Sequence, residues 1–512
     1  MSRYLMGLDA GTTSFKGALY DEQGILVAVH QLDYTLLTPQ TDWVEYPAEA
    51  YWSRFCELTR SLLEKSGVAA RDIEALAISS QGETLVCLDE AGEPLGNAIV
   101  WLDNRAAREA DALRQAFGRR AVYEHTGQAD MLATWPAAKI LWLRENQPDL
   151  FARARRFLLL EDWLLYRLTG RFAGEPNLWV SSALINIHTG QWWPEMLKEV
   201  GLSPDRLPEL LPCGAPVGRL LPAACRESGL HEGTLAVMGA LDQTCNTIGA
   251  GITLPGSVCE TTGSCLAVSA TLPEFVPWQE DAFITCQNHA VPGRYTALLW
   301  SQSAGMVFKW FAKGFYPEFD GNLDAAFERM NRDAARVPAG CEGLLMLPHL
   351  SGASNPEFDP HARGVFFGAT LQHSRAHFTR AIMEAVAFML RRNAEQLTSM
   401  GASFDRMYCM GGASKSPLWL SIKASVTGCA MLPLRVSESA CLGAARLAGV
   451  GAGWYTDIDR AADALLSTGG EFLPDPALKP LYDQCFERYI ALYEALKPVF
   501  ADAWQKPDSP KS

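Results

Sequence analysis

The feature that most constrains the fold is a local pattern that occurs once in each half of the chain. In the first half, a predicted buried strand over Tyr4–Leu8 runs into a turn rich in Gly, Thr and Ser, and a second strand follows over Gly17–Tyr20. In the second half, a strand over Ser257–Glu260 runs into the turn Thr261–Ser264, and Leu266–Ala270 follows. A duplicated α/β unit explains this recurrence most economically. The chain is therefore expected to contain two related α/β domains.

Apolar patterns elsewhere predict the elements that link these turns. Ile73–Ser79, Leu235–Leu241 and Arg406–Met410 are short runs rich in apolar residues, and each is predicted to be a buried strand. A helix is predicted over Phe157–Leu168, ending before Gly170, because glycine is favoured just after a helix. Strands that alternate with helical spans are typical of the α/β class.

Length and composition agree with two such domains. The chain has 512 residues, which is too long for one hydrophobic core, because single cores stop growing near ~250–300 residues. Hydrophobic residues make up 48% of it and charged residues 20%, and this balance excludes a disordered chain. The Gly- and Pro-rich stretch Gly249–Gly256 is the predicted boundary. It separates an N-terminal domain, 1–248, from a C-terminal domain, 249–505, with a frayed tail over 506–512.

Charge and cysteine usage narrow the class of protein. The formal net charge of −14 argues against binding to the phosphate backbone of nucleic acids. No apolar run approaches the ~18–20 residues of a membrane helix. None of the 13 cysteines forms a CxxC pair with another. These features predict a cytoplasmic protein with reduced thiols and with no nucleic-acid or membrane partner.

The turn after the first strand has the composition of a phosphate-binding turn. Asp9 ends the strand, and Gly11 allows consecutive backbone N–H groups to face an anion. Thr12 and Thr13 add hydroxyl donors, while Asp9 is a candidate Mg²⁺ ligand and Lys16 could reach the same phosphates. A plain β-turn is the alternative interpretation of so short a motif.

Two further glycine-containing turns lie in the second half. Thr262 and Gly263 occupy the turn equivalent to the first, so that the two turns together could hold a polyphosphate. Neither turn matches the Walker A or the GxGxxG pattern. Gly411–Ser416 follows a predicted strand, and its bare backbone would let a ribose or a flat ring approach closely. A strand-to-helix loop that needs glycine only for its geometry is the alternative.

Asp242-Gln243 comes directly after the predicted strand Leu235–Leu241. An Asp at the carboxyl end of a strand, near a domain boundary, is well placed to act as a general base on a substrate hydroxyl. From spacing alone, an N-cap for the following helix is the competing interpretation.

In their order along the chain, these motifs resemble the FGGY carbohydrate kinases, a family that includes xylulokinases, gluconokinases and glycerol kinases. The matching segments are Asp9–Thr13, Gln81–Thr84, Asn97–Asp103, Asp242-Gln243, Thr262–Ser264, Pro348–Gly352 and Gly411–Gly428. Lys139–Asn146 and Gly364–Glu384 look like the two signatures of the family. The resemblance runs from residue 3 to about residue 450.

The resemblance implies two actin-like, ribonuclease-H-like domains with a nucleotide and sugar cleft between them, and ATP and Mg²⁺ as cofactors. The residues that it places at the phosphates and metal are Asp9, as the metal ligand, Gly11, Thr12, Thr13, Lys16, Thr262, Gly263 and Gly305. Those that it places at the adenosine are Gly412, Ala413 and Ser416. Those that it places at the sugar are Gln81, Glu83, Trp101, Gln243 and Asp242, which is also the implied catalytic base.

The choice of acceptor depends on departures from the family patterns. Xylulokinases have a Met-His pair where this chain has Gly82-Glu83, and glycerol kinases have Arg-Glu. Asp242-Gln243 is similar to the glycerol kinase pairing, whereas Pro348–Gly352 is closer to the xylulokinase and gluconokinase branches. D-xylulose, phosphorylated to xylulose 5-phosphate, is the leading prediction, and glycerol, erythritol or another polyol are alternatives. An actin-like ATPase is the alternative outside the kinases, and a homodimer is expected by analogy.

Overall fold

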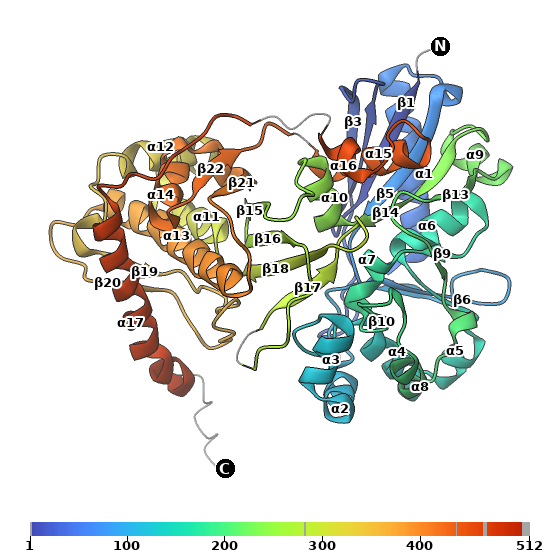
Figure 1. The fold of residues 1–512 in the computed structure, drawn as a ribbon, viewed down its shortest axis with the longest axis horizontal. Coiled ribbons are helices and arrows are strands. Elements are labelled where there is room, and N and C mark those ends of the chain that lie inside the picture. Colours follow the sequence, from blue (N-terminus) through green and yellow to red (C-terminus); the bar gives the residue numbers. More distant parts are fainter. Residues whose placement is uncertain (1–2, 281–282, 437, 464–467, 504–512) are drawn as a thin grey trace. The chain divides into compact units, whose positions relative to one another are not determined.

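The computed structural model describes residues 3–280, 283–436, 438–463 and 468–503, and it divides into two compact units (Figure 1). Unit 1 comprises Met1–Leu254, Pro273–Thr296 and Val436–Leu466, and unit 2 comprises Pro255–Leu272, Ala297–Arg435 and Ser467–Ser512. The chain therefore returns twice to unit 1 after first leaving it. The division predicted at residue 249 places α15 (Ser439–Gly451) in the C-terminal domain, whereas this helix packs on the sheet of unit 1. The tail 506–512 lies outside the described residues.

Unit 1 is built on a six-stranded sheet with the strand order β13-β14-β5-β1-β2-β3. In that order the strands are Pro216–Arg219, Leu235–Leu241, Ile73–Ser80, Tyr4–Ala10, Ser14–Tyr20 and Leu26–Asp33. β5 is parallel to both β1 and β14, whereas β2, β3 and β13 are antiparallel to their neighbours. The carboxyl ends of β14, β5 and β1 therefore meet at one edge of the sheet, which is the edge where α/β proteins bind ligands.

The two faces of this sheet are covered by different helices, α1 (Ala48–Ser66) and α15 (Ser439–Gly451) (Figure 1). Leu8 belongs to the same core cluster as Phe55 of α1, and Leu5 belongs to the same cluster as Ala444 of α15. Successive side chains of a strand point to opposite faces. Odd-numbered residues of β1 therefore face α15, and even-numbered residues face α1.

The rest of unit 1 consists of a smaller sheet and further helices. The smaller sheet has the order β4-β7-β6-β8, with strands at Glu45–Pro47, Asn97–Ile99, Leu85–Leu88 and Arg156–Leu159. Shorter strands are β9 (Ala173–Gly174), β10 (Ile185–Asn186), β11 (Gln191–Trp192), β12 (Glu209–Leu210) and β17 (Thr285–Asn288). The helices are α2 (Ala107–Phe117), α3 (Arg119–Thr126), α4 (Pro136–Asn146), α5 (Pro148–Arg153), α6 (Leu160–Thr169), α7 (Pro176–Trp179), α8 (Pro194–Val200), α9 (Pro222–Ser228), α10 (Asp242–Gly249) and α16 (Ile458–Asp463).

One predicted helix boundary in unit 1 is wrong. Residues 157–159, predicted to begin a helix, are part of β8, which pairs antiparallel with β6. The helix begins only at Leu160, and Gly170 follows its end in the left-handed conformation, as predicted. An apolar run that is fully buried does not by itself distinguish a strand from a helix, and here strand pairing decides its first residues.

Unit 2 contains a second sheet with the strand order β18-β16-β15-β21-β22. In that order the strands are Tyr295–Ser301, Leu266–Leu272, Val258–Thr262, Arg406–Met410 and Ala430–Pro433. β15 is antiparallel to β16 and parallel to β21, which repeats the pairing of β1 with β2 and β5 in unit 1. The hairpin β19 (Leu345–Leu347) and β20 (Val365–Phe367) is separate. The helices are α11 (Gly305–Phe315), α12 (Leu323–Ala334), α13 (Arg375–Ser399), α14 (Pro417–Thr427) and α17 (Lys479–Ala503).

The described residues contain neither a membrane-spanning helix nor a disulfide bond. Within the described ranges, no helix is both long enough and apolar enough to cross a membrane. All 13 cysteines belong to the described part of the chain and are free thiols.

Candidate active site

Two carboxylates lie at the carboxyl ends of two parallel strands of the main sheet in unit 1. Asp9 is near the end of β1, and Asp242 follows β14 directly. β5 lies between the two strands, and its Ser79 donates a hydrogen bond of 2.9 Å to Asp9 Oδ1. Burial raises the pKa of Asp9, while the bond from Ser79 and the charge of Lys16 act in the opposite direction. The sheet therefore brings together two acids that lie 233 residues apart in the sequence.

The Asp242 carboxyl group is held in an unfavourable environment for its ionised form. Burial, followed by the nearby charges of Asp9 and Glu83, raises its pKa from 3.8 to about 7. Its Oδ1 accepts a hydrogen bond of 2.6 Å from the backbone N–H of Gln243. α10 begins at Asp242 itself, its N-cap residue is Leu241, and no side-chain capping bond is formed. A half-buried carboxyl group with a pKa near neutrality has the properties required of a general base.

Glu83 completes this group of acids and has an unusual backbone. Its φ of 54° lies in the left-handed region, which non-glycine residues rarely adopt. Burial raises the pKa of its carboxyl group, whereas a hydrogen bond from Ser181 and the charge of Lys139 lower it. Lys139 is fully buried and donates hydrogen bonds of 3.0 Å each to the backbone oxygens of Glu83 and Val100. Desolvation lowers the pKa of Lys139 to about 7.

The other residues that the sequence predicts at the sugar lie in different environments. Gln81 is buried at the end of β5, where its side-chain N–H donates to the Tyr51 hydroxyl at 3.3 Å. Its Oε1 is buried and has no hydrogen-bond partner among the described residues. The indole N–H of Trp101 donates to Thr12 Oγ1 at 2.9 Å. This bond joins a side chain that is predicted to contact the sugar to one that is predicted to contact the phosphates. Gln243 is exposed.

The predicted phosphate turn of unit 1 connects β1 with β2. The Gly11 N–H donates to the backbone oxygen of Ser14 at 3.1 Å, and Thr13 is exposed at its tip. Lys16, on β2, forms an ion pair of 2.6 Å with Glu438, which immediately precedes α15. This pairing raises the pKa of Lys16 against the effect of burial. The turn therefore carries a cation that already has one carboxylate partner.

In unit 2, three backbone segments form a compact surface made largely of glycine. The N–H of Gly305 donates to the oxygen of Gly263 at 3.0 Å, which joins the turn after β15 to the start of α11. Gly411 has a φ of 81°, and a Cβ there would lie 2.6 Å from the backbone oxygen of Thr262. Gly412 has open space where a Cβ would stand. Side-chain-free backbone of this kind allows close approach of a phosphate or a ribose.

Three predicted nucleotide residues are engaged with the protein itself. The hydroxyl of Thr262 is buried, donates to Glu260 Oε2 at 2.6 Å and accepts from Lys423 Nζ at 2.8 Å. Ser416 is the N-cap of α14 and accepts from the backbone N–H of Trp419. Ala413 is buried. Any nucleotide contact of Thr262 would therefore come from its backbone and not from its hydroxyl.

The residues of unit 1 fit a magnesium ion that is bound mainly by other ligands. Among the described residues, no group of three or more His, Cys, Asp or Glu side chains could enclose a metal. Mg²⁺ typically keeps several waters and takes one or two carboxylates together with substrate phosphates. Asp9, partly exposed at the edge of the sheet, matches this requirement.

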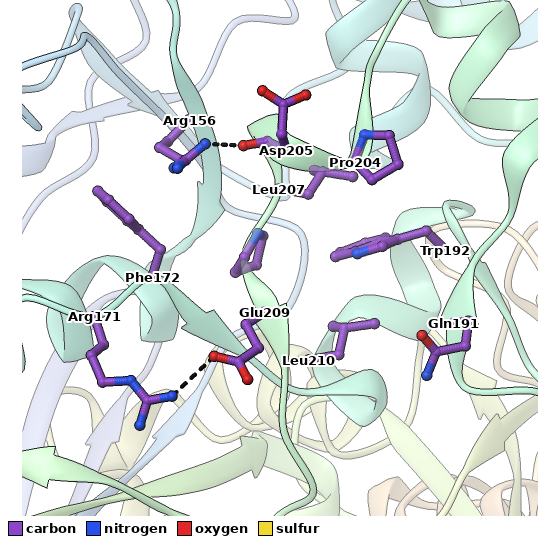
Figure 2. A pocket seen from close by; sticks show the side chains of 11 residues that line it. Arg156, Arg171, Phe172, Gln191, Trp192, Pro204, Asp205, Leu207, Glu209 and Leu210 are labelled. Carbon is purple, nitrogen blue, oxygen red and sulfur yellow. Dashed lines mark hydrogen bonds and ion pairs between the residues drawn. The ribbon is translucent and has the colours of Figure 1, made fainter.

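A pocket of about 620 Å³ lies elsewhere in unit 1, and its lining is different in kind (Figure 2). Arg171 pairs there with Glu209 at 2.9 Å, and Arg156 donates to the backbone oxygen of Asp205. The two acids in its lining are exposed and paired with arginines, Glu209 with Arg171 and Asp205 with Arg155. The chemistry therefore points to the strand ends and not to this pocket.

Some residues at these sites were not predicted from the sequence. Asp9 is contacted by Ser79, Glu83 by Ser181 and Lys16 by Glu438. The sequence around these three partners contains no motif that would indicate a functional site. The remaining two, Lys139 and Lys423, are fully buried in apolar segments of α4 and α14. A lysine within an apolar helical run is a usable signal, because a buried ammonium group needs specific partners.

Family models match most of the chain. The model for the N-terminal domain of the FGGY family of carbohydrate kinases matches residues 4–249, and the model for its C-terminal domain matches residues 234–452. The chain belongs to the FGGY family of carbohydrate kinases. It is therefore a sugar kinase, which is a phosphotransferase, and the resemblance noted in the motifs is confirmed.

Individual relatives of this kinase cover nearly its whole length. It is 28% identical over 500 residues to a xylulose kinase of Bacillus subtilis, which covers 97% of this chain and 98% of that protein. It is 30% identical over 507 residues to an autoinducer-2 kinase of Enterobacter sp. (strain 638), and the match covers 96% of this chain and 94% of that protein. The solved structure of a xylulose kinase from Rhodospirillum rubrum is similar with a TM-score of 0.88 and 28% identity, over 98% of this chain and 100% of that one. The predicted α/β class with two actin-like, ribonuclease-H-like domains is confirmed.

Proposed function

We propose that this kinase transfers the terminal phosphoryl group of ATP to a hydroxyl of a small neutral sugar or polyol, with D-xylulose as the leading acceptor. The observation that carries the proposal is Asp242, whose pKa is raised to about 7 beside Asp9 and Glu83. At neutral pH a substantial fraction of such a carboxyl group is ionised and can take the proton of an attacking hydroxyl. We therefore assign Asp242 as the base.

The charges around Asp242 support a neutral acceptor. Asp9, Glu83 and Asp242 contribute three acidic groups, whereas Lys139 is the buried cation beside Glu83 and Lys16 is paired with Glu438. An anionic acceptor such as gluconate would be repelled by this arrangement, because like charges at short range are unfavourable. Glu83 and the unpartnered Oε1 of Gln81 are the acceptors of hydrogen bonds that we assign to the sugar. Trp101 and the exposed Gln243 are further sugar contacts in this proposal.

We assign the nucleotide and metal to the remaining predicted residues. Asp9 would hold Mg²⁺, with Gly11, Thr12, Thr13 and Lys16 facing the phosphates. When bound, the metal neutralises charge on the phosphates. In unit 2 the backbone of Thr262, Gly263 and Gly305 would face phosphates, and Gly412, Ala413 and Ser416 would lie near the adenosine. The free thiols of the chain support a cytoplasmic location.

Autoinducer-2 is a second candidate acceptor, because the relative with 30% identity is named for it. The test is ADP release measured with D-xylulose, L-xylulose, glycerol, erythritol, ribitol, autoinducer-2 and gluconate. We expect turnover to depend on the acceptor, to be highest with D-xylulose and to be lowest with gluconate. ATP turnover that is the same without any acceptor would overturn the assignment to a sugar, and a higher kcat/KM with autoinducer-2 would replace D-xylulose as the acceptor.

A further inference from the structure

Strand β14, which carries Asp242, contains one extra residue near its end. Its pairing with β5 follows Val237↔Ala77 and resumes at Ala240↔Ser79. Two residues of β14 therefore oppose the single residue Ile78 of β5, which defines a β-bulge.

The bulge reverses the face to which the last residues of β14 point. Before it, Val237 belongs to the core cluster on the α15 face, and Met238 to the cluster on the α1 face. After it, Ala240 belongs to the α15 cluster although its number is even. Because side chains alternate along a strand, the extra residue changes the face to which the end of β14 points, and Asp242 follows that end directly, close enough to Asp9 for their charges to interact. Asp9, an odd-numbered residue of β1, lies on the α15 face.

Gly239 forms the bulge, and its environment accepts no side chain. A Cβ at this position would lie 1.8 Å from the backbone oxygen of Ile78. Its N–H, freed from the strand ladder, donates instead to Oε1 of Glu161 at 2.7 Å. Two residues further on, the N–H of Leu241 donates to Oδ1 of Asn177 at 3.2 Å. Side chains of α6 and α7 thus accept hydrogen bonds from two backbone N–H groups near the end of the strand.

Glu161 is fully buried, and its environment disfavours the ionised form of its carboxyl group. Burial, followed by the charges of Glu175 and Asp162, raises its pKa well above the ordinary value. Its Oε2 is buried and has no hydrogen-bond partner among the described residues. A buried acid is costly to retain if it serves only packing, since an apolar residue of similar size would fill the same space.

We propose that Glu161 is a positioning residue, which fixes the bulge at Gly239 and thereby aims Asp242 at the acceptor hydroxyl. The proposal rests on the proposed function, in which Asp242 is the base. Loss of the bond would leave the Gly239 N–H unsatisfied and would allow the end of β14 to shift. A displacement of about 1 Å in a reacting group is enough to lower turnover by roughly 10²-fold.

Three variants test this role. Glu161→Leu removes the acceptor while keeping the site filled, and Glu161→Gln keeps an oxygen acceptor and mimics the uncharged acid. Thr234→Val is the matched control, because the Thr234 hydroxyl is buried and donates to the oxygen of Ile73 at 2.9 Å, at the opposite end of β14. It removes one buried hydrogen bond between the same two strands without touching the bulge.

We expect Glu161→Leu to lower kcat by about 10–10²-fold with the KM for ATP within about twofold of wild type. Glu161→Gln should restore kcat to within about threefold of wild type, and Thr234→Val should lower the melting temperature without lowering kcat. Hydrogen exchange should accelerate in peptides that cover 239–241 in Glu161→Leu, and not in Thr234→Val.

The proposal is overturned if Glu161→Leu keeps wild-type kcat, if Glu161→Gln is as slow as Glu161→Leu, or if Thr234→Val is equally slow. Failure of the proposed function is recognised separately. In that case wild type shows no acceptor-dependent turnover, or Asp242→Asn is fully active. Hydrogen exchange then tests the role of Glu161 independently of activity. If exchange at 239–241 is the same in Glu161→Leu as in wild type, Glu161 does not stabilise the bulge.

Discussion

Replacing Asp242 with Asn should lower activity and raise stability at the same time. The variant keeps the size of the side chain but cannot accept a proton. We expect kcat to fall by about 10²–10⁴-fold, which is the usual contribution of a positioned base. For wild type, kcat/KM should rise with pH to a plateau above an apparent pKa near 7, because only the ionised carboxylate acts as the base.

The effect on stability follows from the raised pKa. A carboxyl group whose pKa moves from 3.8 to about 7 disfavours its ionised form in the fold by roughly 4 kcal/mol, at about 1.4 kcal/mol per pKa unit. Because Asp242 is partly exposed, solvent screens this unfavourable free energy, and we expect the ionised carboxyl group to destabilise the fold by about 1–2 kcal/mol. The folded state binds the proton more tightly, so wild-type stability falls as pH rises from about 4 to about 7. Asp242→Asn avoids this loss. The variant should therefore be only slightly more stable than wild type at pH 4.5, and its gain in the free energy of unfolding should be complete at pH 8.

Denaturant unfolding at pH 4.5 and pH 8, with ADP-release kinetics over the same range, measures both effects. Asp162→Asn is the matched control. Asp162 is fully buried, and its pKa is also raised to about 7, but it bonds Leu159 N–H and the Trp179 indole. This control should gain stability at pH 8 and keep wild-type kcat. The reasoning is refuted if Asp242→Asn turns over like wild type, or if its stability advantage does not grow with pH.

Three further changes address the metal, the nucleotide and the core of unit 2. Asp9→Asn should lower kcat at saturating Mg-ATP by at least about 10-fold, because in the proposed role the metal would lose a carboxylate ligand; unchanged turnover over a magnesium titration would contradict this. Gly411→Ala should raise the KM for ATP and leave the KM for sugar unchanged, since its Cβ would press on the oxygen of Thr262; equal changes in both constants would contradict a nucleotide role. Lys423→Met should destabilise the protein by about 3–5 kcal/mol in denaturant unfolding, because it leaves Glu260 buried without its partner at 2.8 Å. Adding Glu260→Gln should recover part of that loss, and no recovery would contradict the pairing.

Much of the fold could be predicted from local patterns. The strands Leu235–Leu241 and Arg406–Met410 have the predicted bounds, and the strand–turn–strand repeat appears in both sheets. Short apolar runs between glycine-containing turns leave little choice of element, because strand length and turn geometry are both encoded locally. The ordered motifs also predicted the FGGY family, since many weak matches in one order are far more specific than any single match.

The sequence by itself determined which residues of unit 1 are candidates for the chemistry, and tertiary structure decided how they meet. An Asp after a strand is visible in the sequence, but the face to which it points depends on the register of that strand against its neighbour. The extra residue at Gly239 sets this register, and the acceptor that stabilises it, Glu161, comes from a helix 78 residues earlier in the chain. The environment that raises the pKa of Asp242 likewise depends on distant segments, first through burial and then through the charges of Asp9 and Glu83. Burial and charge are sums over neighbours in space, so the sequence could name Asp242 as the candidate base, but only the packed sheet determines its pKa and its orientation.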